Sequence, residues 1–186
     1  VSDSYQIDKL ALTISEKTRQ LDLLVNCAGM TRFVPHQDLE SLDDDLIDQI
    51  FQVNWRGSFS TIRSFRQLLA NSPEALIINI SSIAGKTGEG SNVAYCASKA
   101  ALDSMTRSLA RALAPKIRVV SVAPGLVETE FIKGLDPDWR EKQLRRTPSG
   151  HFAQPEEVAK PILHLFKDLK SLNGCRLDLD GGRPLG

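Results

Sequence analysis

The fold of this chain is decided by a short, almost wholly apolar segment at residues 75–82, which reads Ala-Leu-Ile-Ile-Asn-Ile-Ser-Ser. Runs of this length and composition are typical of parallel strands that are buried on both faces. Further strand-like runs occur at 21–25, 117–123 and 175–179, and patterns with helical spacing separate them. Strands that alternate with helices predict an α/β protein with a doubly wound parallel sheet.

Apolar residues at helical spacing predict helices over residues 7–14, 47–69 and 95–113, and a last helix that begins at Pro155. The stretch 126–155 has no such regularity, although it is partly apolar. Long ordered loops of this kind usually serve as lids or binding loops. We therefore expect 126–155 to be an irregular substrate-binding region.

The bulk composition excludes several classes of protein. Lysine plus arginine number 23, as do aspartate plus glutamate, so the formal net charge is zero and nucleic acid is not an expected partner. The three cysteines and three histidines lack metal-ligand spacing, and scattered cysteines fit a reducing cytoplasm. No apolar run approaches the roughly 20 residues that span a bilayer. We expect a soluble, cytoplasmic protein without a metal site.

Tyr95 and Lys99 are the strongest candidates for chemistry. Four residues apart on a helix, they share one face, so the ammonium can lie beside the phenol and favour its ionised form. A phenol with a lowered pKa exchanges protons near neutral pH. Taken alone, the pair could equally be a surface helix pair. Ser82 favours the chemical interpretation, because it ends the apolar segment and ligands of parallel sheets bind beyond the carboxyl ends of strands.

Several short motifs stand together in one order: Asn26-Cys27-Ala28-Gly29, Asn54, Ser82, Tyr95 with Lys99, and Pro124-Gly125. Their order and spacing resemble those of the classical short-chain dehydrogenases/reductases, in particular the 3-oxoacyl-(acyl-carrier-protein) reductase-like members. The resemblance covers essentially the whole chain. It implies a three-layer, Rossmann-like sheet with 1–186 as a single domain, NAD or NADP as cofactor, a small-molecule alcohol or ketone as substrate, and a homodimer or homotetramer.

The resemblance also implies a role for each catalytic candidate. Tyr95 would act as the general acid or base on the substrate oxygen, and Ser82 would donate a hydrogen bond to the same oxygen. Lys99 would lower the pKa of Tyr95 and bind the nicotinamide ribose. Asn54 would kink its helix and hold a water on a proton relay to Lys99. Asparagine is locally unfavourable in mid-helix, which supports that role, although a solvent-facing asparagine is the simpler interpretation of the residue alone.

Two turns would contact the cofactor if the resemblance holds. The residues implied are Asn26, Ala28 and Gly29 beside the adenosine ribose, and Pro124, Gly125, Val127 and Thr129 beside the nicotinamide carboxamide. Cys27 departs from the family's more usual asparagine, which leaves some hydrogen bonding around the first turn in doubt. Pro124 and Gly125 could equally form a plain turn after a strand.

Members of this family begin with a strand and a Thr-Gly-x-x-x-Gly-x-Gly turn, which sets the dinucleotide pyrophosphate on a helix N-terminus. Neither occurs in these 186 residues. We expect the parent protein to carry this segment, and we favour that interpretation over a natural truncation. The residue that selects between NAD and NADP would lie there, so the sequence leaves that choice open.

The sequence argues against two other enzyme classes, P-loop nucleotide-binding proteins and serine hydrolases. Gly85-Lys86-Thr87 imitates the end of a P-loop, but Ile80 stands where that motif needs glycine, and the glycines after 85 are interpreted as a flexible approach to the cleft. A serine hydrolase would need glycines at 80 and 84 around Ser82. A non-enzymatic binding or scaffolding subunit stays open as the alternative.

The substrate is not identified by the sequence. A 3-oxoacyl thioester, a sugar or polyol, and a larger cyclic alcohol or ketone all remain open. Three residues of the 126–155 region, Phe131, Leu135 and Trp139, are expected to supply apolar walls.

Overall fold

The computed structural model describes residues 1–185, apart from the side chains of Phe131, Lys133 and Leu185. Its centre is a parallel sheet of four strands in the order β1-β2-β3-β4. The strands are β1 (Leu23–Asn26), β2 (Ala75–Ile80), β3 (Ile117–Pro124) and β4 (Arg176–Leu179). All neighbouring pairs are parallel, with Ile78 opposite Val120 at the centre. The predicted α/β fold with a parallel sheet is therefore confirmed.

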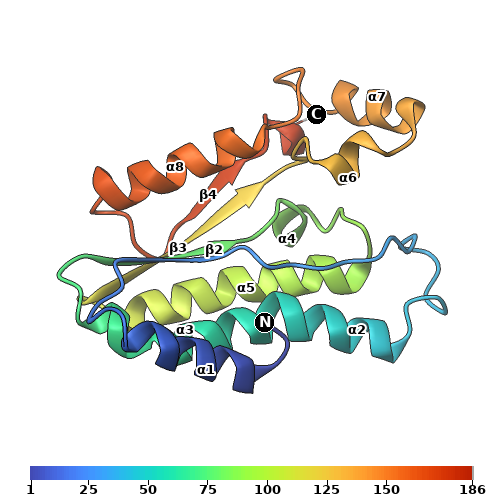
Figure 1. Ribbon diagram of the computed structural model, residues 1–186. Helices are drawn as coiled ribbons and strands as arrows, with labels where there is room; N and C mark the ends of the chain where they lie inside the picture. The colour runs from blue at the N-terminus through green and yellow to red at the C-terminus, as the bar shows by residue number, and fades with distance from the viewer. Residues whose placement is uncertain (186) are drawn as a thin grey trace.

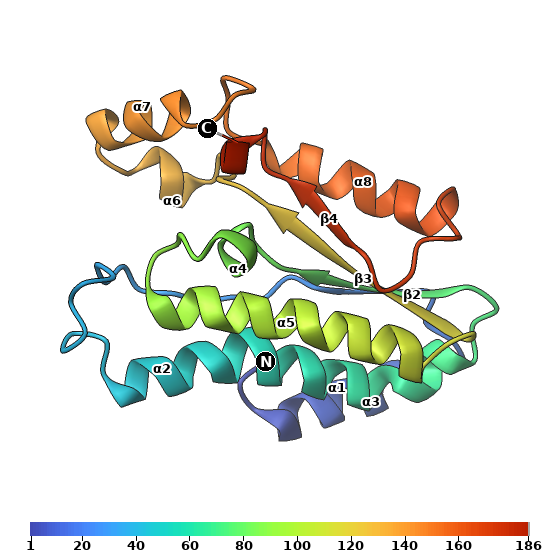
Figure 2. The same cartoon turned by 180° about the vertical axis from the view of Figure 1, so that it is seen from behind.

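Helices cover both faces of the sheet, so the structure has three layers (Figures 1 and 2). The first helical layer contains α1 (Ser4–Ser15), α2 (Asp44–Phe51), the π-helical η1 (Gln52–Gly57), α3 (Ser58–Ala70) and α5 (Val93–Ala112). The opposite face carries α8 (Pro155–Lys167). The shorter elements are α4 (Ala84–Thr87), α6 (Glu130–Lys133), α7 (Pro137–Arg145) and the 3-10 turn η2 (Arg183–Leu185).

Alternate residues of the central strands supply the two cores. Ile77 and Val119 face the first helical layer and join a buried cluster with α1, α3 and α5. Leu76 and Val120 point the other way and pack with Leu165 of α8. All of these strand side chains are fully buried, which explains why the strands read as continuous apolar runs rather than alternating ones. This burial holds the carboxyl ends of β2 and β3 in a fixed position.

Two expectations about loops were wrong. The 126–155 region is not irregular, because it contains α6 and α7, whose first turns are capped by Thr129 and Asp136. The segment after Ser82 is not a flexible approach either. Gly85 lies in α4, and a Cβ at that position would come within 2.8 Å of the Lys99 and Ala100 backbone, so its glycine allows close packing on α5.

Candidate active site

The candidate site forms where β2 and β3 end side by side. Ser82 lies two residues beyond the end of β2. The next residue, Ile83, donates its backbone N–H to the Pro124 carbonyl at the end of β3 over 3.1 Å. The chain then turns through α4 and returns to α5, which carries Tyr95 and Lys99. Parallel strands bring their carboxyl ends to one edge, so the topology gathers these residues at the expected side of the sheet.

Asn92 fixes the start of the helix that carries Tyr95. It is fully buried and is the N-cap residue of α5, where its Oδ1 accepts a hydrogen bond from the Tyr95 backbone N–H over 2.7 Å. Its Nδ2 donates to the Arg32 carbonyl over 2.7 Å, which ties the helix end to a distant loop. We missed this residue in the sequence, although an asparagine just before a helical pattern is a known capping signal.

Ser82 and Tyr95 lie close together, near enough for the Ser82 hydroxyl to lower the pKa of the phenol. Burial nevertheless raises the pKa of the Tyr95 phenol above its ordinary value and outweighs the lowering by Ser82. The lowering of the Tyr95 pKa by Lys99 stays a prediction, because burial sets the direction of the net shift in this arrangement. Lys99 Nζ lies 5.8 Å from the centroid of the Tyr95 ring.

Lys99 is buried, with 5% of its surface exposed, and its Nζ donates to the Ile80 carbonyl over 2.8 Å. Burial lowers the pKa of this lysine to about 8, while the nearby Cys27 and Asp103 raise it. The ammonium is thus protonated at neutral pH but easily neutralised just above it. A Cβ on Gly29 would lie 3.6 Å from Nζ, so the turn after β1 passes directly beside this amine.

Asn54 occupies the π-helical turn η1 and is completely buried, so the solvent-facing interpretation is wrong. Its Oδ1 accepts from the Met30 N–H over 2.8 Å, and its Nδ2 donates to the Met30 carbonyl and to Ser98 Oγ, each over 3.0 Å. Single π-helical turns are frequent at functional sites. Through these bonds Asn54 joins the turn after β1 to α5, where its partner Ser98 directly precedes Lys99.

Asn26 behaves differently from the other residues of its turn. Its carboxamide is buried and donates to Asn79 Oδ1 over 2.9 Å, and Asn79 in turn donates to Thr106 Oγ1 over 2.9 Å. Ser121 completes this chain through a 2.8 Å bond to the same threonine. The Asn26 side chain is therefore engaged within the sheet and its helix layer, whereas Ala28 and Gly29 are exposed.

The residues beyond β3 divide into two groups. Pro124 is buried and lies opposite Leu179 of β4, and Gly125 packs so closely on Asp180 that a Cβ would lie 3.1 Å from the Asp180 Cα. Val127 forms a bridge with Ala153, and Thr129 caps α6. Within the part of the chain that the structure describes, neither of these two contacts Ser82 or Tyr95 by a hydrogen bond.

Arg176 on β4 was missed in the sequence. Its guanidinium donates to the Ser82 carbonyl over 3.0 Å and pairs with Asp103 of α5 over 3.3 Å and with Asp178 over 3.1 Å. The Arg176 and Asp103 side chains are only 15% and 7% exposed. This buried ion pair joins the segment that carries Ser82 to the helix that carries Tyr95. No local sequence signal marks its role, since Ser82 and Asp103 are distant from it in the chain.

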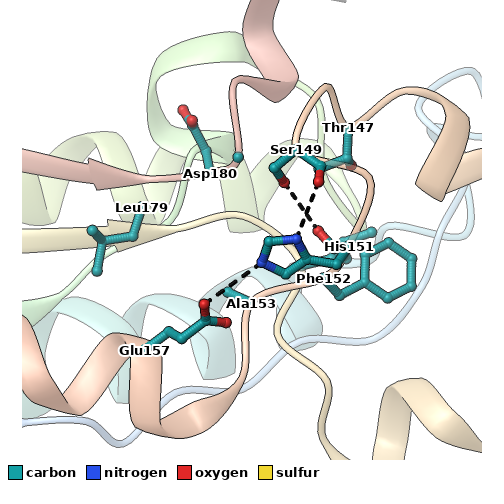
Figure 3. A pocket seen from close by; sticks show the side chains of 10 residues that line it. Thr147, Ser149, His151, Phe152, Ala153, Glu157, Leu179 and Asp180 are labelled. Atoms are coloured by element: carbon teal, nitrogen blue, oxygen red, sulfur yellow. Dashed lines mark hydrogen bonds and ion pairs between the residues drawn. The ribbon is translucent and has the colours of Figure 1, made fainter.

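Two cavities lie near this edge. The first, of about 280 Å³, opens between the 126–155 region and the end of β4, and Figure 3 shows how His151 reaches from Ser149 toward Glu157 within it. His151 Nε2 lies 3.6 Å from Glu157 Oε1. The second, of about 290 Å³, is lined by Ile83, directly after Ser82.

Both cavities take residues from the 126–155 region, and its substrate role stays a prediction. Leu135 and Trp139 line neither of these two described cavities. The predicted wall residue Phe131 has a side chain outside the described residues.

Other kinds of site find no support in the described residues. No group of three or more histidine, cysteine, aspartate or glutamate side chains there could hold a metal ion. None of the helices in that same part of the chain combines the length and the hydropathy needed to cross a membrane.

Comparison with known proteins assigns the chain to a family. A family model described as enoyl-(acyl carrier protein) reductase matches residues 1–183. The 3-oxoacyl-(acyl-carrier-protein) reductase FabG of Thermotoga maritima is 36% identical over 98% of this chain and 74% of its own length. Carbonyl reductase family member 4 of Danio rerio is 35% identical over 100% of this chain and 75% of its own length.

A solved structure supports the same assignment. The 3-oxoacyl-(acyl-carrier protein) reductase from Brucella melitensis superimposes with a TM-score of 0.87 at 31% identity, over 97% of this chain and 69% of that one. The sequence matches and this superposition agree on fold and family. The chain therefore belongs to the short-chain dehydrogenase/reductase family of oxidoreductases.

Proposed function

We propose that the protein is an NAD(P)(H)-dependent oxidoreductase that interconverts a secondary alcohol and a ketone, with Tyr95 as the general acid or base. The observation that carries this proposal is the close approach of Ser82 to Tyr95, with the buried ammonium of Lys99 one helical turn away. This set lies at the carboxyl edge of a parallel sheet, where ligands of such folds bind.

The residues present fit a nicotinamide dinucleotide. The exposed backbone of Ala28 and Gly29 lies beside a buried lysine amine, and a side chain on residue 29 would approach both that amine and Asn54 Oδ1 to 3.6 Å. A glycine there leaves room for a close-lying ligand. Ala28, Gly29 and Lys99 would hold one part of the cofactor, and Gly125, Val127 and Thr129 another. The cofactor supplies the hydride acceptor or donor.

The chain's own residues handle the proton. Because burial raises its pKa, the Tyr95 phenol is protonated at neutral pH and can donate its proton to the oxygen of a ketone. Ser82 donates a hydrogen bond to the same oxygen and orients the substrate. The Lys99 ammonium, with a pKa of about 8, supplies a positive charge near the phenolate that remains after transfer.

The names of the relatives suggest the first substrate to test. Two of the three proteins compared above are 3-oxoacyl-(acyl-carrier-protein) reductases. We infer that a 3-oxoacyl thioester is the best starting compound, followed by simple ketones and by polyols in the reverse direction. The direction that best suits the raised pKa of Tyr95 is ketone reduction.

The decisive experiment follows the consumption of NADH or NADPH by the purified protein with a 3-oxoacyl thioester. The Tyr95→Phe variant removes only the phenolic oxygen. Its turnover should fall by roughly a hundredfold or more, the usual contribution of a general acid, while the Kd for the cofactor stays within about twofold. The matched control is Tyr5→Phe, because Tyr5 is the chain's other tyrosine and lies exposed on α1.

Retention of most of the activity by Tyr95→Phe would sink the catalytic assignment. Failure of the unaltered protein to bind either cofactor would contradict the proposal as a whole and would favour the scaffolding alternative.

A further inference from the structure

The side chains that line the second cavity, near Ser82, carry a net positive charge. Its lining residues are Ile83, Thr87, Glu89, Arg146, Arg183 and Pro184. They come from the segment after β2, from Arg146 at the C-cap of α7, and from η2. Two guanidinium groups face one carboxylate, so the lining carries an excess of one positive charge in a chain whose formal net charge is zero.

This cavity adjoins the Ser82–Tyr95 pair. Ile83 directly follows Ser82, and Glu89 directly precedes Gly90, where a Cβ would lie 3.2 Å from Cδ1 of the Tyr95 ring. The segment from 82 to 90 therefore touches Tyr95 at both of its ends, and residues just inside these ends line the cavity. The cavity is therefore joined to the Tyr95 site by neighbouring residues at both ends of this segment.

Both arginines keep unused donors. The Arg146 guanidinium donates to Glu89 over 2.5 Å, and Arg183 donates to the Gln143 backbone carbonyl over 3.2 Å and to the Gln143 side-chain oxygen. A guanidinium has five N–H donors, so these bonds leave several free. Burial and then repulsion from Arg146 lower the pKa of the Arg183 guanidinium. A second anion in the cavity would relieve that repulsion.

We infer that this cavity is a subsite for an anionic group, a carboxylate or a phosphate, on the substrate that the Ser82–Tyr95 pair acts on. The inference rests on the proposed oxidoreductase function and adds ketones that carry an acidic group to the 3-oxoacyl thioester as substrates to be tested. Arginine suits the role because its planar fork binds both oxygens of such a group at once. A volume of about 290 Å³ accommodates one acidic group on a short chain.

Anion binding can be measured without cofactor or turnover. The thermal midpoint of the protein is followed while inorganic phosphate or acetate replaces chloride at constant ionic strength. We expect one or both anions to raise the midpoint saturably. Arg183→Gln should weaken this binding by about tenfold or more, the value of a charge-assisted hydrogen bond. The matched control is Arg145→Gln, because Arg145 is 73% exposed and pairs with Glu141 instead.

Two further variants distinguish a loss of anion binding from a loss of folded structure. Arg183→Lys keeps the charge without the fork and should bind the anion with intermediate affinity. Glu89→Gln removes the carboxylate that occupies Arg146 and should tighten anion binding severalfold. Tighter binding cannot arise from damage to the fold, so Glu89→Gln tests the inference even if the arginine variants are unstable.

Turnover gives an independent readout. The KM for acetoacetate should rise by about tenfold in Arg183→Gln while the KM for its methyl ester stays unchanged, because the ester lacks the charge. If no ketone is turned over, the proposed function fails while the binding measurements still decide on the subsite. The inference is overturned if neither anion binds saturably, or if Arg183→Gln and Arg145→Gln bind equally well.

Discussion

The candidate catalytic residues and the candidate substrate region, residues 126–155, are held in opposite ways. Asn54, Asn92 and Lys99 are 0%, 0% and 5% exposed, and each bonds to backbone groups of a distant segment. The substrate region relies instead on pairs between charged side chains, of which Arg146 with Glu89 is 43% and 63% exposed. The catalytic candidates are thus fixed by buried hydrogen bonds, whereas the exposed ion pairs of the candidate substrate region each contribute little to stability.

The largest effect that tests this contrast is expected at Lys99. Lys99→Ala should lower kcat/KM by roughly a hundredfold or more and also weaken cofactor binding. The reason is that the same buried ammonium would both stabilise the Tyr95 phenolate and bind the cofactor. Steady-state kinetics and a cofactor titration measure the two effects separately. Lys116→Ala is the control, since Lys116 is exposed. Unchanged cofactor affinity in Lys99→Ala would argue against a ribose contact by this lysine.

The next effect concerns Arg176, which joins the two parts of the catalytic region. Arg176→Met leaves the Asp103 carboxylate buried without its ion-pair partner, and this should lower the free energy of unfolding by about 3 kcal/mol. The double variant Arg176→Met with Asp103→Leu should recover much of the loss, because both buried charges are then gone. Urea unfolding of the unaltered protein, the two single variants and the double variant measures these changes in unfolding free energy. An additive double variant would mean that the two residues do not act as a pair.

A smaller effect should appear in the pH dependence of stability. The pKa of Lys99 is about 8 in the folded protein and 10.5 in its reference state. Between pH 8 and pH 10.5 the unfolded chain therefore binds more protons at Lys99 than the folded protein does. The free energy of unfolding of the unaltered protein should therefore rise with pH across this window, relative to Lys99→Met, by about 3 kcal/mol or less. Parallel curves for the two proteins would show that burial does not depress this pKa.

The smallest effect is expected in the substrate region. Arg140 pairs with both oxygens of Glu128 over 2.8 and 3.1 Å, with side chains that are 23% and 17% exposed. Glu128→Gln should cost about 1 kcal/mol of unfolding free energy at low salt and less at high salt, because the pair is partly screened. Chemical unfolding at two salt concentrations tests this. A loss as large as that of Arg176→Met would break the contrast between the two regions.

Much of the fold could be predicted, because its signals are local. The apolar segment at 75–82 contains β2, and the helical spacing over 95–113 corresponds to α5. The substrate region was misjudged because α6 and α7 are short and α7 is mostly polar, so their apolar periodicity is weak. The catalytic roles of Ser82, Tyr95 and Lys99 stay predictions, although the structure brings the three residues together.

By itself the sequence determined the parallel strands, the helices between them and the spacing of Tyr95 and Lys99, since these depend on residues close together in the chain. Only the tertiary structure decided the rise in the Tyr95 pKa, the ion pair between Arg176 and Asp103, and the meeting of Arg146 with Arg183. Burial and charge balance depend on which distant segments come into contact. No local pattern of residues carries that information.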